Sequence, residues 1–160
     1  MPNSQPRSLI VNALRRHGDA DHLYLAEHGQ FWTSGNRQAH EQMMEVRRRR
    51  RMRFHRGNCF INALRLYCSA PEFRYVEGIA TVLGHDYADW HAWVVTPDGH
   101  VADPTWKLYG GPGGPSMAIY FGMIGPAPDV RKSHGMQTYR LFEATGVLGL
   151  VPRTGESKGD

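Results

Sequence analysis

The first 70 residues carry apolar side chains at positions three and four apart, which is the spacing of one helix face. This pattern predicts helices over residues 8–17, 37–52 and 59–69, and a further one over 23–32. Pro71 closes the helix that begins at Cys59 because proline cannot continue a helix. The helices before residue 54 form an N-terminal helical segment, 7–53, which we expect to pack beside the core.

The middle of the chain is rich in β-branched and aromatic residues, which favour strands. It predicts strands over residues 74–82, 90–96 and 100–103. The intervening Pro97-Asp98-Gly99 suits a three-residue hairpin loop that pairs Thr96 with His100. Because side chains alternate along a strand, this loop places His91 and Asp103 on the same face, whereas a two-residue loop would separate them.

The last third of the chain carries weaker signals. Residues 116–124 and 138–143 predict further ordered elements, and the polar residues 152–160 predict a disordered tail. A chain of 160 residues is long enough to bury one core. We therefore expect a single α+β domain over residues 1–151.

Three residues of the predicted elements have the chemistry of a nucleophilic catalyst: Cys59, His91 and Asp103. A thiol attacks, an imidazole moves its proton and a carboxylate orients the imidazole. We expect Asn58 to cap the helix that begins at Cys59, where the helix dipole and free N–H groups favour a thiolate. A free cysteine is usually a core residue, as we expect for Cys68, but His91 and Asp103 favour a catalytic Cys59.

Four short motifs follow one another between residues 57 and 106. They are Gly57-Asn58-Cys59, Arg74-Tyr75-Val76-Glu77-Gly78, His91-Ala92-Trp93-Val94 and Asp103-Pro104-Thr105-Trp106. In this order they resemble the motif series of the transglutaminase-like superfamily. The resemblance implies a papain-like α+β fold, in which a helix with the cysteine at its N-terminus packs on an antiparallel sheet that carries the histidine and the aspartate. It also implies thiol-dependent acyl transfer on amide or peptide substrates, of the protease, deamidase or transglutaminase type.

The same resemblance implies a role for each motif residue. Cys59 matches the nucleophile, His91 the general base and Asp103 the orienting acid. The N–H of Cys59 is the first oxyanion donor that we expect. Further candidates for the oxyanion site or the cleft are Asn58, Trp93 and Trp106. No calcium-binding motif is present, so calcium-dependent cross-linking is not supported.

The nine histidines raise the question of a metal site. His85, Asp86, Asp89 and His91 can be combined into one on paper. However, the chain has neither a His-Glu-x-x-His nor a Cys-x-x-Cys motif. We therefore expect no metal and no cofactor.

Seven arginines lie just before Cys59 with no acidic residue among them: Arg47, Arg48, Arg49, Arg50, Arg51, Arg53 and Arg56. The formal net charge of the chain is +4, so the remaining residues are net acidic. This basic patch favours nucleic acid or an acidic protein as a partner. It is also typical of a solvated helix end, and a third interpretation is recruitment of an acidic substrate to Cys59. The alternative function is therefore a catalytically silent transglutaminase-like protein that binds a partner through this Arg-rich helix.

From the N-terminal residues we expect no targeting signal. The N-terminal residues have no apolar run long enough for a signal peptide, and no stretch is long enough to cross a membrane. We expect a cytoplasmic protein with no membrane partner. Cys59 and Cys68 lie on different faces of one predicted helix, so we expect no disulfide between them.

Overall fold

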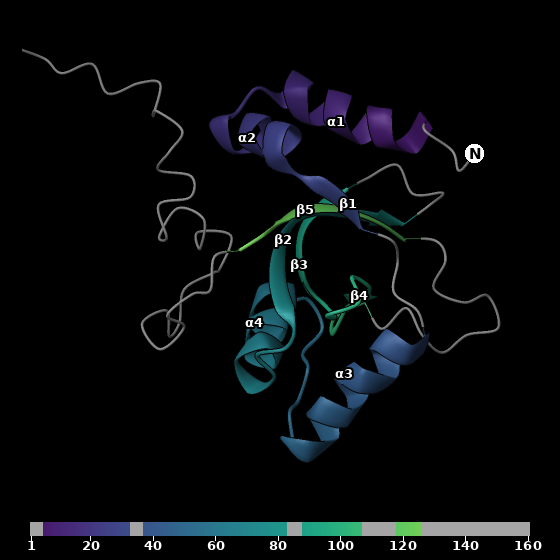
Figure 1. Cartoon of the computed structure of the whole chain (residues 1–160). Helices are drawn as coiled ribbons and strands as arrows, with labels where there is room; N and C mark the ends of the chain where they lie inside the picture. Colours follow the sequence, from purple (N-terminus) through teal and green to yellow (C-terminus); the bar gives the residue numbers. More distant parts are fainter. Residues whose placement is uncertain (1–4, 33–36, 83–87, 107–117, 126–160) are drawn as a thin grey trace, which may run out of the picture.

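The computed structural model of this chain describes residues 5–32, 37–82, 88–106 and 118–125 (Figure 1). These residues form four helices and five strands. The helices are α1 (Gln5–His17), α2 (Ala20–His28), α3 (Arg37–Arg49) and α4 (Cys59–Ser69). The strands are β1 (Gln30–Trp32), β2 (Arg74–Val82), β3 (Asp89–Val95), β4 (Val101–Ala102) and β5 (Ala118–Ile124).

All five strands form one sheet in the order β1-β5-β2-β3-β4, and every neighbouring pair is antiparallel. The sheet is curled. Helices α1 and α2 pack together at its β1–β5 end, whereas α4 packs on β2 and β3 and α3 contacts α4 and β4 (Figure 1). The predicted α+β class is confirmed for the described residues.

Strands β2 and β5 approach each other closely at a pair of glycines. Gly78 pairs with Gly122 across these strands. A Cβ atom at Gly78 would lie 2.2 Å from the Phe121 carbonyl oxygen and 2.4 Å from the Cα of Gly122. Both distances are far inside van der Waals contact, so only glycine allows the two backbones to come this close.

Two predicted elements match the structure at both ends. Strand β2 covers Arg74–Val82 and helix α4 covers Cys59–Ser69, as the sequence predicts. The prediction of one helix over 23–32 is wrong, because α2 ends at His28 and residues 30–32 form β1 instead. Gly29 lies between α2 and β1. A larger residue would not fit there, because a Cβ would lie 2.6 Å from the Phe121 ring. Phe31 then packs on Phe121 with ring centroids 4.5 Å apart.

The predicted helix over 37–52 ends early, at Arg49. The Met52 N–H donates to the Arg47 carbonyl and the Arg51 N–H to the Arg48 carbonyl, which is the hydrogen-bond pattern of a Schellman motif. Arg51 occupies the left-handed position of this motif with φ of 53°, where glycine is the usual residue. The basic patch is therefore divided between the end of α3 and the segment that leads to Cys59.

Some predictions fall on other parts of the chain. The element predicted over 138–143 and the tail over 152–160 lie outside the described residues. Within the described residues, no helix combines the length and the apolar character that a membrane span requires.

Candidate active site

The β3–β4 hairpin brings His91 and Asp103 together. Its loop has the predicted form: the Thr96 N–H donates to the His100 carbonyl at 2.9 Å, and Gly99 has φ of 85°. Val95 pairs with Val101 in this register. As a result, His91 Nε2 lies 2.7 Å from Asp103 Oδ2, and both side chains are buried. The predicted geometry of this pair is confirmed.

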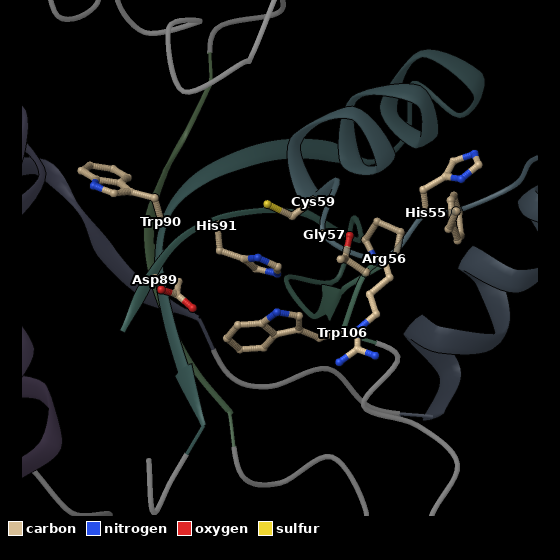
Figure 2. A pocket seen from close by; sticks show the side chains of 11 residues that line it. His55, Arg56, Gly57, Cys59, Asp89, Trp90, His91 and Trp106 are labelled. Carbon is tan, nitrogen blue, oxygen red and sulfur yellow. The ribbon is translucent and has the colours of Figure 1, made fainter. Parts of the chain in front are cut away.

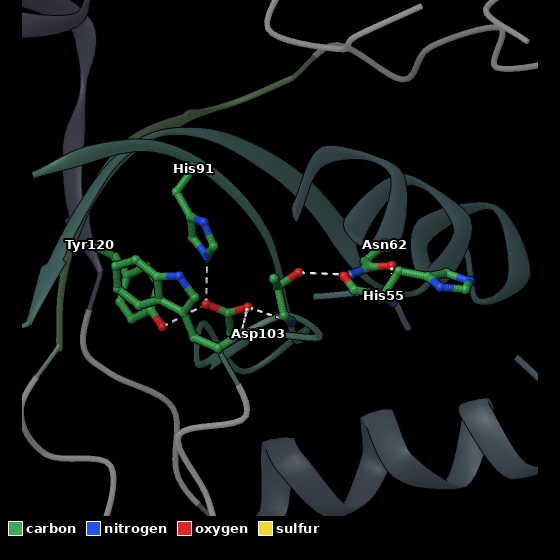
Figure 3. A network of polar contacts seen from close by, with 7 residues as sticks. His55, Asn62, His91, Asp103 and Tyr120 are labelled. Atoms are coloured by element: carbon green, nitrogen blue, oxygen red, sulfur yellow. Dashed lines mark hydrogen bonds and ion pairs between the residues drawn. The ribbon is translucent and has the colours of Figure 1, made fainter. Parts of the chain in front are cut away.

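Four groups hold the Asp103 carboxylate (Figure 3). Oδ1 accepts hydrogen bonds from the N–H groups of Thr105 and Trp106, at 2.8 and 3.0 Å. Oδ2 accepts one from the Tyr120 hydroxyl at 2.9 Å and faces His91. Burial opposes ionisation, but the charge of His91 and these hydrogen bonds outweigh it, and the pKa of Asp103 is lowered. Asp103 is therefore an ionised, fixed partner for the imidazole.

The His91 ring is fixed on two sides. Its Nε2 faces Asp103, and its plane stacks on Trp106 with centroids 4.4 Å apart and an interplanar angle of 29°. Burial lowers the pKa of His91, but the Asp103 charge, hydrogen bonds to Asp103 and Cys59, and the Cys59 charge raise it to about 9. His91 is therefore an imidazolium at neutral pH, with Nδ1 as the nitrogen left for the thiol.

Cys59 and His91 line one pocket of about 850 Å³ (Figure 2). Its walls come from the segment before α4, the start of β3 and the turn after β4. The lining residues are Phe54, His55, Arg56, Gly57, Cys59, Asp89, Trp90, His91, Pro104, Thr105 and Trp106. The thiol is therefore accessible from a cavity large enough for a peptide segment, although Cys59 is only 9% exposed.

Cys59 is the first residue of α4, and the Asn62 N–H donates to the Asn58 carbonyl at 2.9 Å. Asn58 thus occupies the predicted N-cap position. Its side chain makes no cap hydrogen bond, so that part of the prediction is wrong. The backbone of Asn58, with φ of −106° and ψ of 52°, lies outside the extended region from which a side chain reaches the first turn. Asn58 is exposed and does not line the pocket.

The two tryptophans expected at the cleft have different places. Trp106 lines the pocket and stacks on His91. Trp93 instead lies fully buried in the core, with its ring 5.0 Å from Tyr120. Its indole fills the space above Gly122, where a Cβ would meet Trp93 Cη2 at 2.6 Å. Trp93 is therefore a packing residue and is removed from the cleft candidates.

Asn62, which the sequence did not suggest, joins three segments of the pocket. Its Oδ1 accepts from the His55 N–H at 3.0 Å, and its Nδ2 donates to the His55 carbonyl at 2.7 Å. Nδ2 also donates to Thr105 Oγ1 at 2.9 Å (Figure 3). An asparagine on the apolar face of a predicted helix is the signal that could have identified it, because a buried amide requires partners.

Glu77 is a second buried polar residue that sequence reasoning missed. Its side chain lies in the core, where Oε1 accepts a hydrogen bond from the Tyr75 hydroxyl at 2.5 Å. Oε2 has no hydrogen-bond partner among the described residues. Burial raises the pKa of Glu77 to about 8 despite the Tyr75 hydrogen bond, and the Cys59 charge adds to the rise. Glu77 is therefore a neutral acid at neutral pH, within electrostatic range of the thiol.

The arginines of the basic patch lie at different distances from the pocket. Arg48 pairs with Glu45 at 2.6 Å on the surface of α3, and Arg47 stacks over Phe54 with its guanidinium carbon 5.6 Å from the ring centroid. Arg56 is the member of the patch that lines the pocket. The structure thus separates the helix arginines from one arginine beside the candidate nucleophile.

The described residues contain one group with spacing suited to a metal ion. Ligand atoms of His17, Asp19 and His22 lie within 4.8 Å of one another. The two imidazoles stack at 4.0 Å and 14°, so one ion cannot lie in both ring planes as metal ligation requires. Of the set considered from the sequence, Asp89 and His91 line the pocket, whereas His85 and Asp86 lie outside the described residues.

Comparisons with known proteins returned nothing. No family model, no curated protein and no solved structure matched this chain. The geometry of the site is therefore what indicates a function for this protein.

Proposed function

We propose that this protein is a thiol-dependent acyltransferase or hydrolase that acts on amide or peptide substrates through Cys59, His91 and Asp103. The observation that carries the proposal is the position of His91. Its Nε2 lies 2.7 Å from the hydrogen-bonded Asp103 carboxylate, and the same ring interacts with the Cys59 thiol in a pocket that both residues line. This arrangement suits the papain-like core that the motif resemblance implies.

The reaction follows from the charges of the pair. A Cys59 thiolate beside the His91 imidazolium attacks the carbonyl carbon of the amide. The C–N bond then breaks as His91 gives its proton to the leaving amine. His91 next removes a proton from water, and the hydroxide resolves the thioester into a carboxylic acid and the thiolate. An amine acceptor in place of water would give a new amide.

The start of α4 supplies the first stabiliser of the oxyanion. The first N–H groups of a helix have no partner within the helix, and they carry the positive end of its dipole. Cys59 is the first residue of α4, which supports its N–H as a donor to the negative charge that develops in the tetrahedral intermediate.

The two cysteines of the chain provide an internal test. Cys59 is only 9% exposed, whereas Cys68 is an exposed residue of α4, so the expectation that Cys68 lies in the core is wrong. Accessibility alone predicts that iodoacetamide modifies Cys68 faster. Partial burial of its thiol raises the pKa of Cys68, whereas Cys59 lies beside the His91 ring at a helix N-terminus, which is the usual setting of a reactive thiol. We therefore expect Cys59 to react faster at pH 7, measured at each site by mass spectrometry.

A His91→Ala variant should remove the advantage of Cys59, and a His100→Ala variant should keep it, because His100 lies on the same hairpin outside the pocket. Cys59→Ala should then abolish turnover of amide substrates. A Cys59 that reacts no faster than Cys68, with no response to His91→Ala, would rule out the catalytic proposal.

The exposed arginines support a second candidate, a binding protein that engages nucleic acid or an acidic protein. Arg48, Arg49, Arg50, Arg51, Arg53 and Arg56 are all exposed. Binding of this kind would weaken steeply with salt and would depend on the arginines. It would be unchanged in Cys59→Ala, which separates it from the first candidate.

A further inference from the structure

The walls of the Cys59 pocket carry opposite charges in two places. Arg56 stands in the segment before α4, and Asp89 is the first residue of β3. Figure 2 shows the two side chains on opposite sides of His91. A substrate that lies across Cys59 and His91 therefore meets a cation on one side and an anion on the other.

Arg56 is available to such a substrate. Among the described residues, no carboxylate lies within ion-pair distance of its guanidinium, whereas Arg48 pairs with Glu45 at 2.6 Å and Arg37 with Glu41 at 2.8 Å. The exposed Arg53, three residues earlier, does not line the pocket. A pocket-lining cation without an internal partner is suited to bind an anion of the ligand.

Other parts of the pocket wall are aromatic, which should strengthen the interaction of Arg56 with a bound anion. Phe54, Trp90 and Trp106 all line the pocket. Their aromatic surfaces exclude water from a bound substrate, and charges interact more strongly where water is displaced. The interaction with Arg56 should therefore exceed that of an arginine on an open surface.

We infer that the pocket selects acidic peptide substrates, in which a carboxylate lies on the Arg56 side of the amide that Cys59 attacks. Asp89 disfavours an anion on the other side. This inference rests on the proposed function, because it assumes that Cys59 is the nucleophile. It assigns specificity to Arg56, apart from the helix arginines.

Two alkylating probes of nearly equal size test the charge preference. Iodoacetate carries a carboxylate and iodoacetamide a neutral amide; in both, a bond forms between sulfur and the CH₂ carbon and iodide leaves. We expect the ratio of their rate constants, iodoacetate over iodoacetamide, to be higher at Cys59 than at Cys68 in the same molecule. Arg56→Gln should lower the ratio at Cys59 by about three- to fivefold, the usual size of one partly exposed charge interaction.

Matched variants separate a local effect from net charge. Arg53→Gln removes the same charge three residues earlier, outside the pocket lining, and should change the ratio by about twofold at most. Arg56→Lys should retain the ratio, and Asp89→Asn should raise it. Equal effects of Arg56→Gln and Arg53→Gln, or no effect of either, would overturn the inference.

The same data test the catalytic role of Cys59 and the acidic specificity of the pocket separately. If Cys59 reacts no faster than Cys68 with iodoacetamide, the proposed function fails regardless of the ratio. If Cys59 is the faster site and its ratio does not respond to Arg56→Gln, the catalytic proposal stands and the acidic specificity is wrong.

Discussion

The Tyr120 hydroxyl and the His91 imidazole meet at one oxygen atom of Asp103. Oδ2 lies 2.9 Å from the hydroxyl and 2.7 Å from Nε2. Tyr120 belongs to β5, which is separated from the β3–β4 hairpin by β2 in the sheet order. The hydrogen bond therefore ties the orienting carboxylate to a strand that is not a neighbour of the hairpin in the sheet.

Replacement of Tyr120 by Phe should remove this donor while the ring stays packed. A buried hydrogen bond to a charged acceptor contributes about 1.5–3 kcal/mol, so we expect a loss of that size in the free energy of unfolding at pH 7. The pKa of Asp103 is lowered in the folded protein, so its ionised form contributes stability above its ordinary pKa of 3.8. The loss should therefore persist down to pH 4 and shrink only as pH falls through the lowered pKa. Urea unfolding at several pH values measures it.

Tyr24→Phe is a suitable control, because Tyr24 lies on α2 outside the pocket. It should change the unfolding free energy by less than about 0.5 kcal/mol. Equal losses in the two variants would show that the hydroxyl of Tyr120 has no special role at Asp103.

Asp103→Asn should lower the pKa of His91. The carboxylate charge and its hydrogen bond raise this pKa to about 9 against the opposing effect of burial. Without the Asp103 charge, only the interactions with Cys59 oppose the effect of burial, so the pKa of His91 should fall. A larger fraction of the imidazole would then be neutral at pH 7, and alkylation of Cys59 should slow. NMR titration of the His91 ring measures the pKa directly, and Asp98→Asn in the exposed hairpin loop should leave it at about 9.

The sequence predicted those parts of this site that depend on local chemistry. The loop at residues 97–99 set the hairpin register, and the register placed His91 beside Asp103. The helix that starts at Cys59 was also predicted, since its apolar spacing and Pro71 are local signals. The proximity of His91 to Cys59 was predicted only through the motif resemblance. In the structure both residues line one pocket.

Two of the residues that the sequence did not suggest, Tyr120 and Asn62, depend on contacts between distant segments. Tyr120 reaches Asp103 only through the curl of the sheet, and Asn62 reaches Thr105 across 43 positions of the chain. Strand β1 is three residues long and exists because it pairs with β5, so no periodicity in residues 30–32 could reveal it. Asn58 reached its predicted position, but its backbone angles, which sequence does not specify, prevented the cap.

Glu77→Gln should change the pH dependence of stability. Burial raises the pKa of Glu77 from 4.5 to about 8, so between these values the folded protein binds a proton that the unfolded chain releases. Stability of the wild type should therefore fall as pH rises from 5 to 8, by up to about 1.4 kcal/mol per pH unit from this group. Glutamine has the same shape and does not titrate, so the variant should gain stability relative to the wild type over this range.

The effect of Glu77 is measured as the difference in unfolding free energy between Glu77→Gln and the wild type at each pH. This difference is needed because His91 also makes stability fall as pH rises. Its pKa is raised from 6.5 to about 9, so its stabilising effect is lost as pH rises through that window in both proteins. Urea unfolding at pH 5 and pH 8 gives the four free energies. Glu72→Gln, an exposed acid just before β2, serves as the control, and a Glu77→Gln difference that is constant with pH would contradict a neutral buried Glu77.

Arg51→Gly should stabilise the fold. Arg51 holds the left-handed conformation with φ of 53° at the end of α3, which costs a residue with a Cβ about 1–2 kcal/mol. Glycine avoids this cost but loses about 0.5–1 kcal/mol of chain entropy, so the net gain should be about 0.5–1 kcal/mol. Arg49→Gly removes the same charge from the last helical residue of α3 and should instead destabilise by about 1 kcal/mol. Thermal unfolding of the two variants should therefore shift in opposite directions, and shifts of the same sign would mean that charge outweighs backbone conformation here.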